Sequence, residues 1–324
     1  MRWNTRNDAV MMPQSRVSSP ILLLVFNRPD ITREVFEAIR HARPTKLYIG
    51  ADGPRKNISG ELEKVNAVRE YIMGNIDWSC EVQTRFRDTN LGCKRAVSDA
   101  ISWFFSCESE GIILEDDCLP VPGFFTFCEW GLHEYRNRKA VGMISGSNLI
   151  DYLSPSPYRH GFSKYINVWG WATWRDRWND CDLSISFSDI RRLDQQLIQD
   201  RALSTVERVF WKNVFKHTVM FPSTWDWYVQ FQFFKYNLLS VFPSRNLVTN
   251  LGFGDSGTHT YGTPPLYWKK SLPDPKLDLM SLPVCDDFAV NRNRDRMLAA
   301  TIWHCSPWRT VRLTLMNLAR YLGT

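Results

Sequence analysis

In the segment Gly111-Ile112-Ile113-Leu114-Glu115-Asp116-Asp117 an apolar run passes directly into three acids, here called the acidic triplet. Such a short apolar run is typical of a strand that is buried on both faces. Three adjacent carboxylates repel one another, and they cost stability at the end of a buried strand unless a cation compensates them. The alternative interpretation is a solvated acidic turn.

The sequence around the acidic triplet alternates between strand-like and helix-like patterns. Before it, strands are predicted over 21–26, 47–49, 80–86 and 111–114, with helices between them over about 30–41 (capped by Asp30), 59–73 and 90–105. After it, the predicted elements are a helix over about 122–136, a strand over 141–145, loops over 147–168 and 252–275, a helix over about 224–236, a strand over 239–242 and helices from about 290 onward. This alternation predicts an α/β fold with a mostly parallel central sheet and helices on both faces.

The composition describes a folded domain with a mild positive charge. Of the 324 residues 44% are hydrophobic, which excludes disorder for most of the length. We expect one principal domain over 20–262, a polar N-terminal tail over 1–19 and a helical C-terminal extension over 263–324. The net charge of +6 is too small and too scattered to indicate nucleic-acid binding, and it suits an anionic small ligand.

The eight cysteines are dispersed, without a CxxC pair or a zinc-type spacing, and they indicate buried thiols in a reducing compartment. Residues 1–19 are polar, so no secretory signal is predicted. No apolar run reaches the length of about 18 residues that a transmembrane helix needs. We therefore expect a cytoplasmic protein, with which a peripheral contact on the inner face of the membrane is compatible.

Polar residues follow each of the first predicted strands. Arg28 follows the first strand, Asp52 the second, Arg87 and Asp88 the third, and the acidic triplet the fourth. Ligands of a parallel α/β sheet bind outside the carboxyl ends of its strands, so these side chains are expected at one edge. Carboxylate oxygens suit Mg²⁺ or Mn²⁺, and the cations suit phosphate, so the set favours a diphosphate with a divalent metal. For Asp52 the alternative is a turn-forming residue before Gly53.

Lys94 and Arg95 lie in the first turn of a predicted helix, where the helix N-terminus and both cations favour phosphate. The alternative for both residues is an ordinary place on the surface. A Walker loop and a GxGxxG fingerprint are both absent from the sequence, which removes the usual support for an ATPase or a dehydrogenase.

A resemblance rests on segments that occur in order along the chain, namely PILLLVFNRPD (20–30), YIGADGP (48–54), NLGCKRAV (90–97), GIILEDDCLPVPGFF (111–125), NVWGWATWRDRW (167–178), TWDWYVQF (224–231) and NLVTNLGFGDSGTHT (246–260). Together they resemble bacterial glycosyltransferases of the GT-A, or nucleotide-diphospho-sugar transferase, superfamily. Within it, the chain is similar to the N-acetylglucosaminyltransferase I group and its bacterial relatives. The resemblance implies an inverting transferase that uses a nucleotide-sugar, UDP-sugars being favoured, with Mn²⁺ or Mg²⁺.

The resemblance also implies roles for residues at the strand ends. Asp117 matches the direct metal ligand of the family, and Asp116 matches a contact near the ribose or the sugar, with Glu115 as a supporting residue. Asp52 matches the acid that bonds the uracil or the ribose, and Arg28 matches a position near the nucleotide.

Asp226 in Trp225-Asp226-Trp227 matches the segment in which the family places its catalytic base. It would take the proton from the acceptor hydroxyl. Eukaryotic members carry two consecutive acids there and this chain carries one. Independently of the resemblance, a carboxylate between two Trp residues is expected to be partly desolvated, which favours a base. The alternative is an N-cap role for the following helix.

Two further residues are candidates for the metal site and the donor site. His259 lies in a Gly-rich loop and is a candidate second metal ligand, while the alternative is an exposed loop histidine. Trp171, in a Gly-Trp pair that resembles one beside the family's donor sugar, is a candidate stacking platform, and the alternative is a core residue.

The C-terminal residues resemble a basic amphipathic helix, with Trp303, Trp308, Val311, Leu315, Leu318 and Leu322 beside Arg309, Arg312 and Arg320. Packing on the catalytic domain is the favoured interpretation. Contact with an anionic membrane and contact with a second subunit, which would make a homodimer, are the alternatives.

The sequence thus predicts a bacterial glycosyltransferase of polysaccharide biosynthesis that moves a hexosyl or N-acetylhexosaminyl group to the hydroxyl of a glycan, a lipid-linked saccharide or a protein. One rival is a sugar-phosphate nucleotidyltransferase, although the residues after the first strand lack its usual Gly-rich loop. The other rival is a non-catalytic, membrane-active binding protein.

Overall fold

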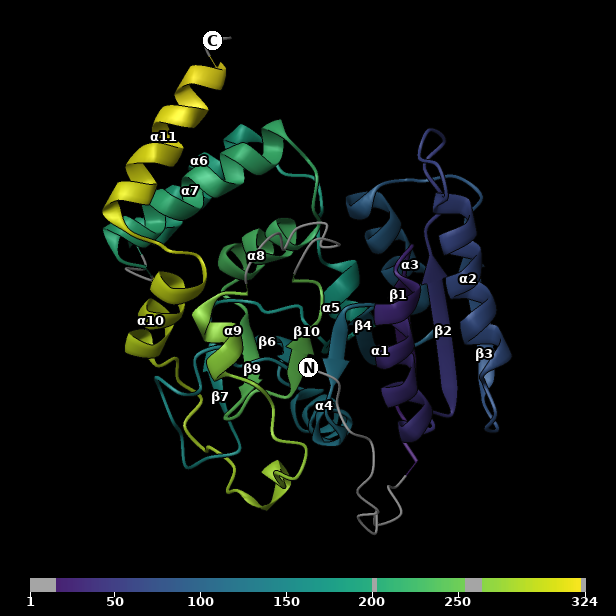
Figure 1. Ribbon diagram of the computed structural model, residues 1–324. Coiled ribbons are helices and arrows are strands. Elements are labelled where there is room, and N and C mark those ends of the chain that lie inside the picture. Colours follow the sequence, from purple (N-terminus) through teal and green to yellow (C-terminus); the bar gives the residue numbers. More distant parts are fainter. Residues whose placement is uncertain (1–15, 200–202, 254–263, 322–324) are drawn as a thin grey trace.

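The computed structural model describes residues 16–199, 203–253 and 264–321. Eight strands of these ranges form one sheet, in the spatial order β3 (Glu81–Phe86), β2 (Lys46–Ala51), β1 (Ile21–Val25), β4 (Glu110–Glu115), β8 (Trp171–Trp174), β6 (Val141–Ser145), β9 (Leu239–Pro243) and β7 (His160–Ser163) (Figure 1). The first four strands pair in parallel, as do β6 and β9, whereas β8 and β7 run antiparallel to their neighbours. The predicted α/β class with a mostly parallel sheet is confirmed, and the arrangement is compatible with a Rossmann-like fold.

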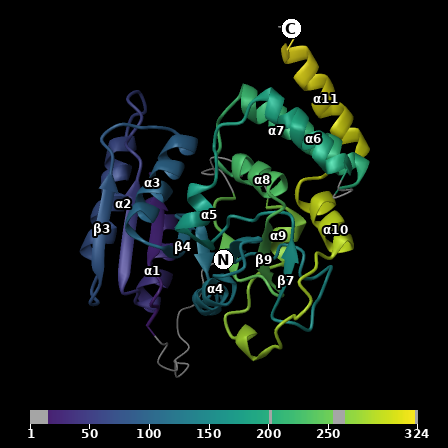
Figure 2. The ribbon, with the colours of Figure 1, turned by 180° about the vertical axis from the view of Figure 1, so that it is seen from behind.

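Strand β1 shows why the apolar runs of the sequence are continuous. Ile21, Leu23 and Val25 belong to a core that contains residues of α1 (Pro29–Ala42), α2 (Glu61–Gly74) and α4 (Pro122–Tyr135). Leu22 and Leu24 belong to a second core, with residues of α3 (Cys93–Cys107), α5 (Arg175–Asn179) and α8 (Asp226–Lys235). Because successive side chains of a strand point to opposite faces, both faces of the sheet need apolar residues, and helices cover both (Figures 1 and 2).

A third apolar core lies around Trp211. It joins one side of α8 to α6 (Phe187–Gln199), α7 (Thr205–Met220) and α10 (Arg292–Ile302). Helix α11 (Pro307–Tyr321) packs on α7 at the edge of the molecule (Figure 1). The C-terminal residues are therefore helical, as predicted, and α10 is part of a core shared with α6, α7 and α8.

Several predicted boundaries need correction. The predicted loop over 147–168 contains β7, and the segment 167–178, for which no element was predicted, contains β8. The predicted loop over 252–275 contains α9 (Leu266–Lys270), and beyond it lies a short 3-10 helix, η1 (Leu279–Ser281). A small second sheet pairs β5 (Cys118–Pro120) with β10 (Val248–Asn250).

The first helix begins one residue earlier than predicted. Arg28 is its N-cap, Pro29 occupies the first turn, and Asp30 lies inside that turn instead of capping it. Proline fits the first helical position because its fixed φ suits the helix and its missing N–H would have no partner there. The consequence for the site is that Arg28 is held at the junction of β1 and α1.

The end of the predicted N-terminal tail packs on the domain. Val17 is buried and its N–H donates to the carbonyl of Ala42. The backbone N–H groups of Ser18 and Ser19 both donate to Glu129.

The structure can be compared with two of the observations on which the expected cellular location rests, the cysteines and the lack of a predicted transmembrane helix. All eight cysteines are free, but burial is complete only for Cys118 and Cys128. Within the described ranges, no helix combines the length and the apolar character needed to cross a membrane.

Candidate functional site

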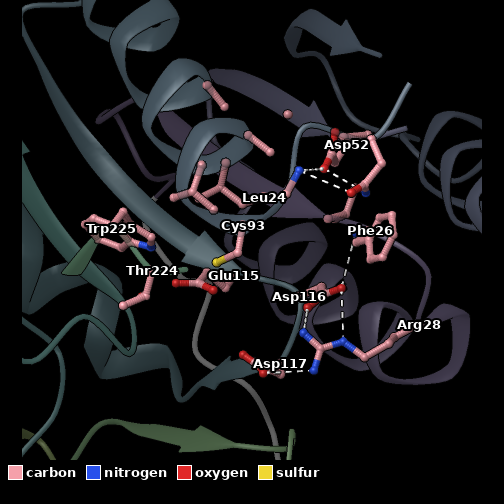
Figure 3. A pocket seen from close by; sticks show the side chains of 18 of the residues that line it. Leu24, Phe26, Arg28, Asp52, Cys93, Glu115, Asp116, Asp117, Thr224 and Trp225 are labelled. Atoms are coloured by element: carbon pink, nitrogen blue, oxygen red, sulfur yellow. Dashed lines mark hydrogen bonds and ion pairs between the residues drawn. The ribbon is translucent and has the colours of Figure 1, made fainter. Parts of the chain in front are cut away.

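A cavity of about 330 Å³ opens at the carboxyl ends of the parallel strands (Figure 3). This volume is in the range of small-molecule sites, about 300–1,000 Å³. Its polar lining comes from six places in the sequence, and the residues are Arg28, Asp52, Arg55, Arg85, Arg87, Asn90, Glu115, Asp116, Asp117, Thr224, Asp226 and Asn250. The structure thereby brings Arg28, Asp52, the acidic triplet and Asp226 into one cavity.

Arg28 bonds two carboxylates of the acidic triplet. Its guanidinium donates to Asp116 through two nitrogens and to Asp117 Oδ2 at 3.0 Å. Asp116 also accepts from the backbone N–H of Phe26 at 3.3 Å. Burial opposes the charge on Arg28, but the attraction of Asp116 and then Asp117 outweighs it and raises the pKa of the guanidinium. Asp116 therefore orients Arg28, while Asp117 is the more exposed of the two carboxylates.

Glu115 is a buried carboxyl group close to three other carboxylates of the cavity. Burial, followed by repulsion from Asp117, Asp116 and Asp226, raises its pKa to about 8. The sulfur of Cys93 points toward Glu115 in Figure 3, and burial, followed by the charges of Glu115 and Asp226, raises the thiol pKa to about 12. The end of β4 is thus a place where added positive charge is favourable.

Asp52 organises the loop that precedes α3. Its carboxylate accepts hydrogen bonds from the N–H groups of Gly53 at 2.9 Å, Leu91 at 3.0 Å and Gly92 at 3.2 Å, and from the side chain of Asn90 at 2.9 Å. Burial raises the pKa of Asp52, and the backbone hydrogen bonds oppose that rise. Asp52 therefore has a structural role in joining two loops, and it also lines the cavity.

Arg55, Arg85 and Arg87 form a basic side of the cavity, and of these only Arg87 was expected at this edge from the sequence, as a residue that follows the third strand. Arg85 donates to Asp99 at 2.8 Å, and Arg87 pairs with the same carboxylate. Arg55 pairs with Glu61. Arg85 and Arg87 are two residues apart at the end of β3, so the strand period of two places them on one face. From this spacing, the sequence could have indicated that Arg85 lies on the same face as Arg87.

The start of α8 forms the wall that faces the basic side. Asp226 is the first residue of the helix and accepts a hydrogen bond from the hydroxyl of Thr224. The N-cap is Trp225, so the N-cap interpretation of Asp226 is wrong. Trp225 lines the cavity and stacks on Trp171, with ring centroids 5.7 Å apart.

Three of the remaining candidates, Trp171, Lys94 and Arg95, do not line the cavity. Trp171 is buried behind Trp225, whereas Trp169 lines the cavity. Lys94 Nζ lies 3.6 Å from the centroid of the Tyr228 ring, and neither Lys94 nor Arg95 contributes to the cavity. His259 lies outside the described residues.

The described carboxylates fit a metal only if a ligand shares in holding it. Among the residues that the structure describes, no group of three or more His, Cys, Asp or Glu side chains is placed to hold a metal ion. A cation bound with a phosphate ligand needs only one or two protein carboxylates, since phosphate oxygens and water complete its shell. Asp117 meets that requirement, and the crowding around Glu115 favours a cation nearby.

Neither the protein-family models nor the curated proteins compared with this chain match it.

Proposed function

We propose that the chain is a glycosyltransferase of GT-A fold, which moves a sugar from a nucleoside diphosphate sugar to an acceptor hydroxyl with inversion. The observation that carries the proposal is one cavity in which Arg28, the acidic triplet and Asp226 meet, although they come from β1, β4 and α8. A mixture of cations and carboxylates suits a diphosphate joined to a sugar. Cations bind the phosphate oxygens, and carboxylates accept hydrogen bonds from the sugar hydroxyls.

The basic side of the cavity suits the diphosphate and the nucleoside. Arg28, Arg55, Arg85 and Arg87 line the region beside β1, β2 and β3. Cations held in place stabilise the negative charge that grows on the departing diphosphate, without needing to reorient during the reaction. Trp169 and Phe26, which also line the cavity, offer flat apolar surfaces for a base or a sugar ring.

Asp226 is assigned as the general base. It takes the proton of the acceptor hydroxyl, whose oxygen forms the new bond to the anomeric carbon as the bond to the diphosphate oxygen breaks. The Thr224 hydroxyl donates to one oxygen of Asp226 and so orients the carboxylate. Attack from the face opposite the leaving group inverts the anomeric centre.

Asp117 is assigned as the protein ligand of Mn²⁺ or Mg²⁺, with His259 as a candidate second ligand. A divalent cation at this position supplies charge neutralisation to the diphosphate. Asp116 holds the Arg28 guanidinium beside Asp117 through a hydrogen bond. Glu115 has a supporting role as the last residue of β4.

The experiment is a transfer assay with a panel of nucleoside diphosphate sugars, led by UDP-sugars, and hydroxyl acceptors that are glycans, lipid-linked saccharides or peptides. Release of nucleoside diphosphate and a mass gain of one sugar on an acceptor are expected for the wild type. Asp226→Asn should transfer at least about 100-fold more slowly, which is the usual contribution of a general base. Asp182→Asn, a carboxylate away from the cavity lining, is the matched control.

Two outcomes overturn the proposal. Transfer by Asp226→Asn at the wild-type rate removes the base assignment. Pyrophosphate release from a nucleoside triphosphate and a sugar phosphate assigns the cavity to nucleotidyl transfer.

A further inference from the structure

Helix α11 attaches to the molecule through polar side chains. The amide of Asn213 on α7 donates to the hydroxyl of Thr314 at 2.7 Å, and the amide of Asn317 donates to the carbonyl of Asn213 at 2.9 Å. Thr310 and Asn317 are both buried. The face of α11 that meets the domain is therefore mainly polar, with two hydrogen bonds to α7 and with Leu313 as a partly buried apolar contact.

The opposite face of α11 is apolar and exposed. The exposed fractions are 86% for Trp308, 53% for Val311 and 60% for Leu315. The spacing i, i+3, i+7 places these three side chains in one stripe along the helix. A surface helix of a globular protein usually turns such a stripe inward, so the orientation of α11 is the reverse of the usual one.

Positive charge borders the apolar stripe. Arg309 and Arg312 are exposed, and Arg312 lies four residues after Trp308 and three before Leu315, beside the stripe. The helix sequence from Pro307 to Tyr321 contains no Asp or Glu. In Figures 1 and 2, α11 lies at the periphery of the molecule beside α7, so the stripe is not covered by another element of the described chain.

We infer that the outer face of α11 docks on a lipid bilayer with anionic headgroups. An apolar stripe beside arginines matches the interfacial layer, where the apolar side chains enter the acyl boundary and the guanidinium groups meet lipid phosphates. Trp308 suits this place because an indole is apolar over most of its surface and carries one N–H donor. A symmetric contact with a second copy would bring the arginines of both copies together, and their repulsion opposes it.

The test is sedimentation of the full chain with vesicles. One set contains equal parts of phosphatidylglycerol and phosphatidylcholine, and the other contains phosphatidylcholine alone. We expect binding to the anionic set only, and loss of that binding as the ionic strength rises from about 0.05 to about 0.5 M. The double variant Arg309→Gln/Arg312→Gln should lower the partition coefficient more than about tenfold, given the contribution of each arginine at an anionic surface.

The apolar stripe has its own variants. Trp308→Ser and Val311→Ser should each weaken binding to the anionic vesicles severalfold, and because both side chains are exposed the fold should survive. The matched control is Leu62→Ser on α2, a leucine that is 53% exposed and lies far along the chain from α11, and it should bind as the wild type does.

Three results overturn the inference. Equal binding of wild type and the arginine double variant removes the electrostatic part, and equal binding of wild type and Trp308→Ser removes the stripe. A wild-type dimer in light scattering that becomes a monomer in Trp308→Ser assigns the face to a second copy of the chain.

Discussion

The carboxylate of Asp52 holds two loops of the cavity together through hydrogen bonds within the protein. It connects the end of β2 to the loop before α3, where the two segments touch closely. A Cβ atom on Gly53 would lie 2.4 Å from the backbone nitrogen of Thr89, so only glycine allows this approach. Together the hydrogen bonds of Asp52 and the absence of a side chain at Gly53 hold the two loops in contact.

Replacing Asp52 should therefore destabilise the loop. In Asp52→Ala the backbone N–H groups of Leu91 and Gly92 lose their acceptor, and the free energy of unfolding should fall by about 1–3 kcal/mol. Urea unfolding measures the difference. Asp88→Ala, at an exposed position of the neighbouring loop, should change stability little, and an equal loss in both variants would contradict this role for Asp52.

His160 gives a prediction for the pH dependence of stability. It is buried, and the hydroxyl of Tyr135 lies 2.6 Å from its Nε2. Burial, with the nearby charge of Arg159, lowers the pKa of His160 from 6.5 to about 4. Between these values the unfolded chain binds a proton that the folded chain does not. The free energy of unfolding therefore has its full value, as far as His160 is concerned, above pH 6.5. It decreases as the pH falls toward 4, by up to about 3 kcal/mol.

The measurement compares urea unfolding at pH 7.5 and pH 4.5 for the wild type and for His160→Gln. The variant should lose less stability over this interval, whatever its stability at pH 7.5. His133→Gln removes an exposed histidine of α4 and should follow the wild type. Parallel losses in the wild type and His160→Gln would show that His160 titrates normally in the folded state.

At the scale of elements, α10 is joined to the sheet by a buried carboxylate. Asp295 accepts hydrogen bonds from the hydroxyl of Ser163 at 2.6 Å and from the N–H of Lys164 at 3.0 Å, and Arg294 Nη1 lies 3.7 Å from it. Ser163 ends β7. The chain beyond the predicted boundary at 262 therefore completes the fold around β7.

Removing this carboxylate should test that connection. Asp295→Ala leaves the donors of Ser163 and Lys164 buried without an acceptor, and it should lower the free energy of unfolding by about 2–4 kcal/mol. Asp286→Ala, at an exposed position before α10, is the matched control in the same urea titration. A loss below about 0.5 kcal/mol for Asp295→Ala, the usual range of surface substitutions, would mean that the Asp295 hydrogen bonds do not stabilise the junction of α10 and β7.

Elements with a strong local signal could be predicted, and elements set by distant pairing could not. The apolar runs of β1 and β4 and the helical pattern of α1 appear in the sequence itself. Strand β8 is short, and its place between β4 and β6 depends on antiparallel pairing with both, which the alternation of strands and helices does not encode. Helix α7 did have a signal, because Ser204 and Glu207 form a capping box, but no helix was predicted there.

The same distinction holds for the candidate site. Arg28, Asp52 and the acidic triplet could be placed from the sequence because each directly follows a strand, and the ends of parallel strands share an edge. Trp169 and Trp171 could not be told apart, since the sheet alone decides which one faces the cavity and which one packs behind Trp225.

At the scale of the whole molecule, charge is divided across the cavity. Arg55, Arg85 and Arg87 line it beside β2 and β3, with Asp52 close to them. The acidic triplet and Asp226 line it at β4 and α8, with Arg28 paired to the triplet. A nucleotide-sugar with a divalent cation would need both sides, because the arginines would bind the diphosphate and the carboxylates would bind the cation and the acceptor hydroxyl. Binding is therefore a more direct test of the whole arrangement than any property of a single residue.

The most direct measurement is a calorimetric titration of the protein with nucleoside diphosphate sugars, UDP-sugars first, with Mn²⁺ and with a chelator. The wild type should bind one of these donors only with Mn²⁺, Asp226→Asn should bind it as the wild type does, and Asp117→Asn should lose more than about tenfold in affinity. Circular dichroism of both variants checks that they are folded. Binding that Asp117→Asn and the chelator leave unchanged, or no binding of any donor with Mn²⁺, would contradict the proposed function.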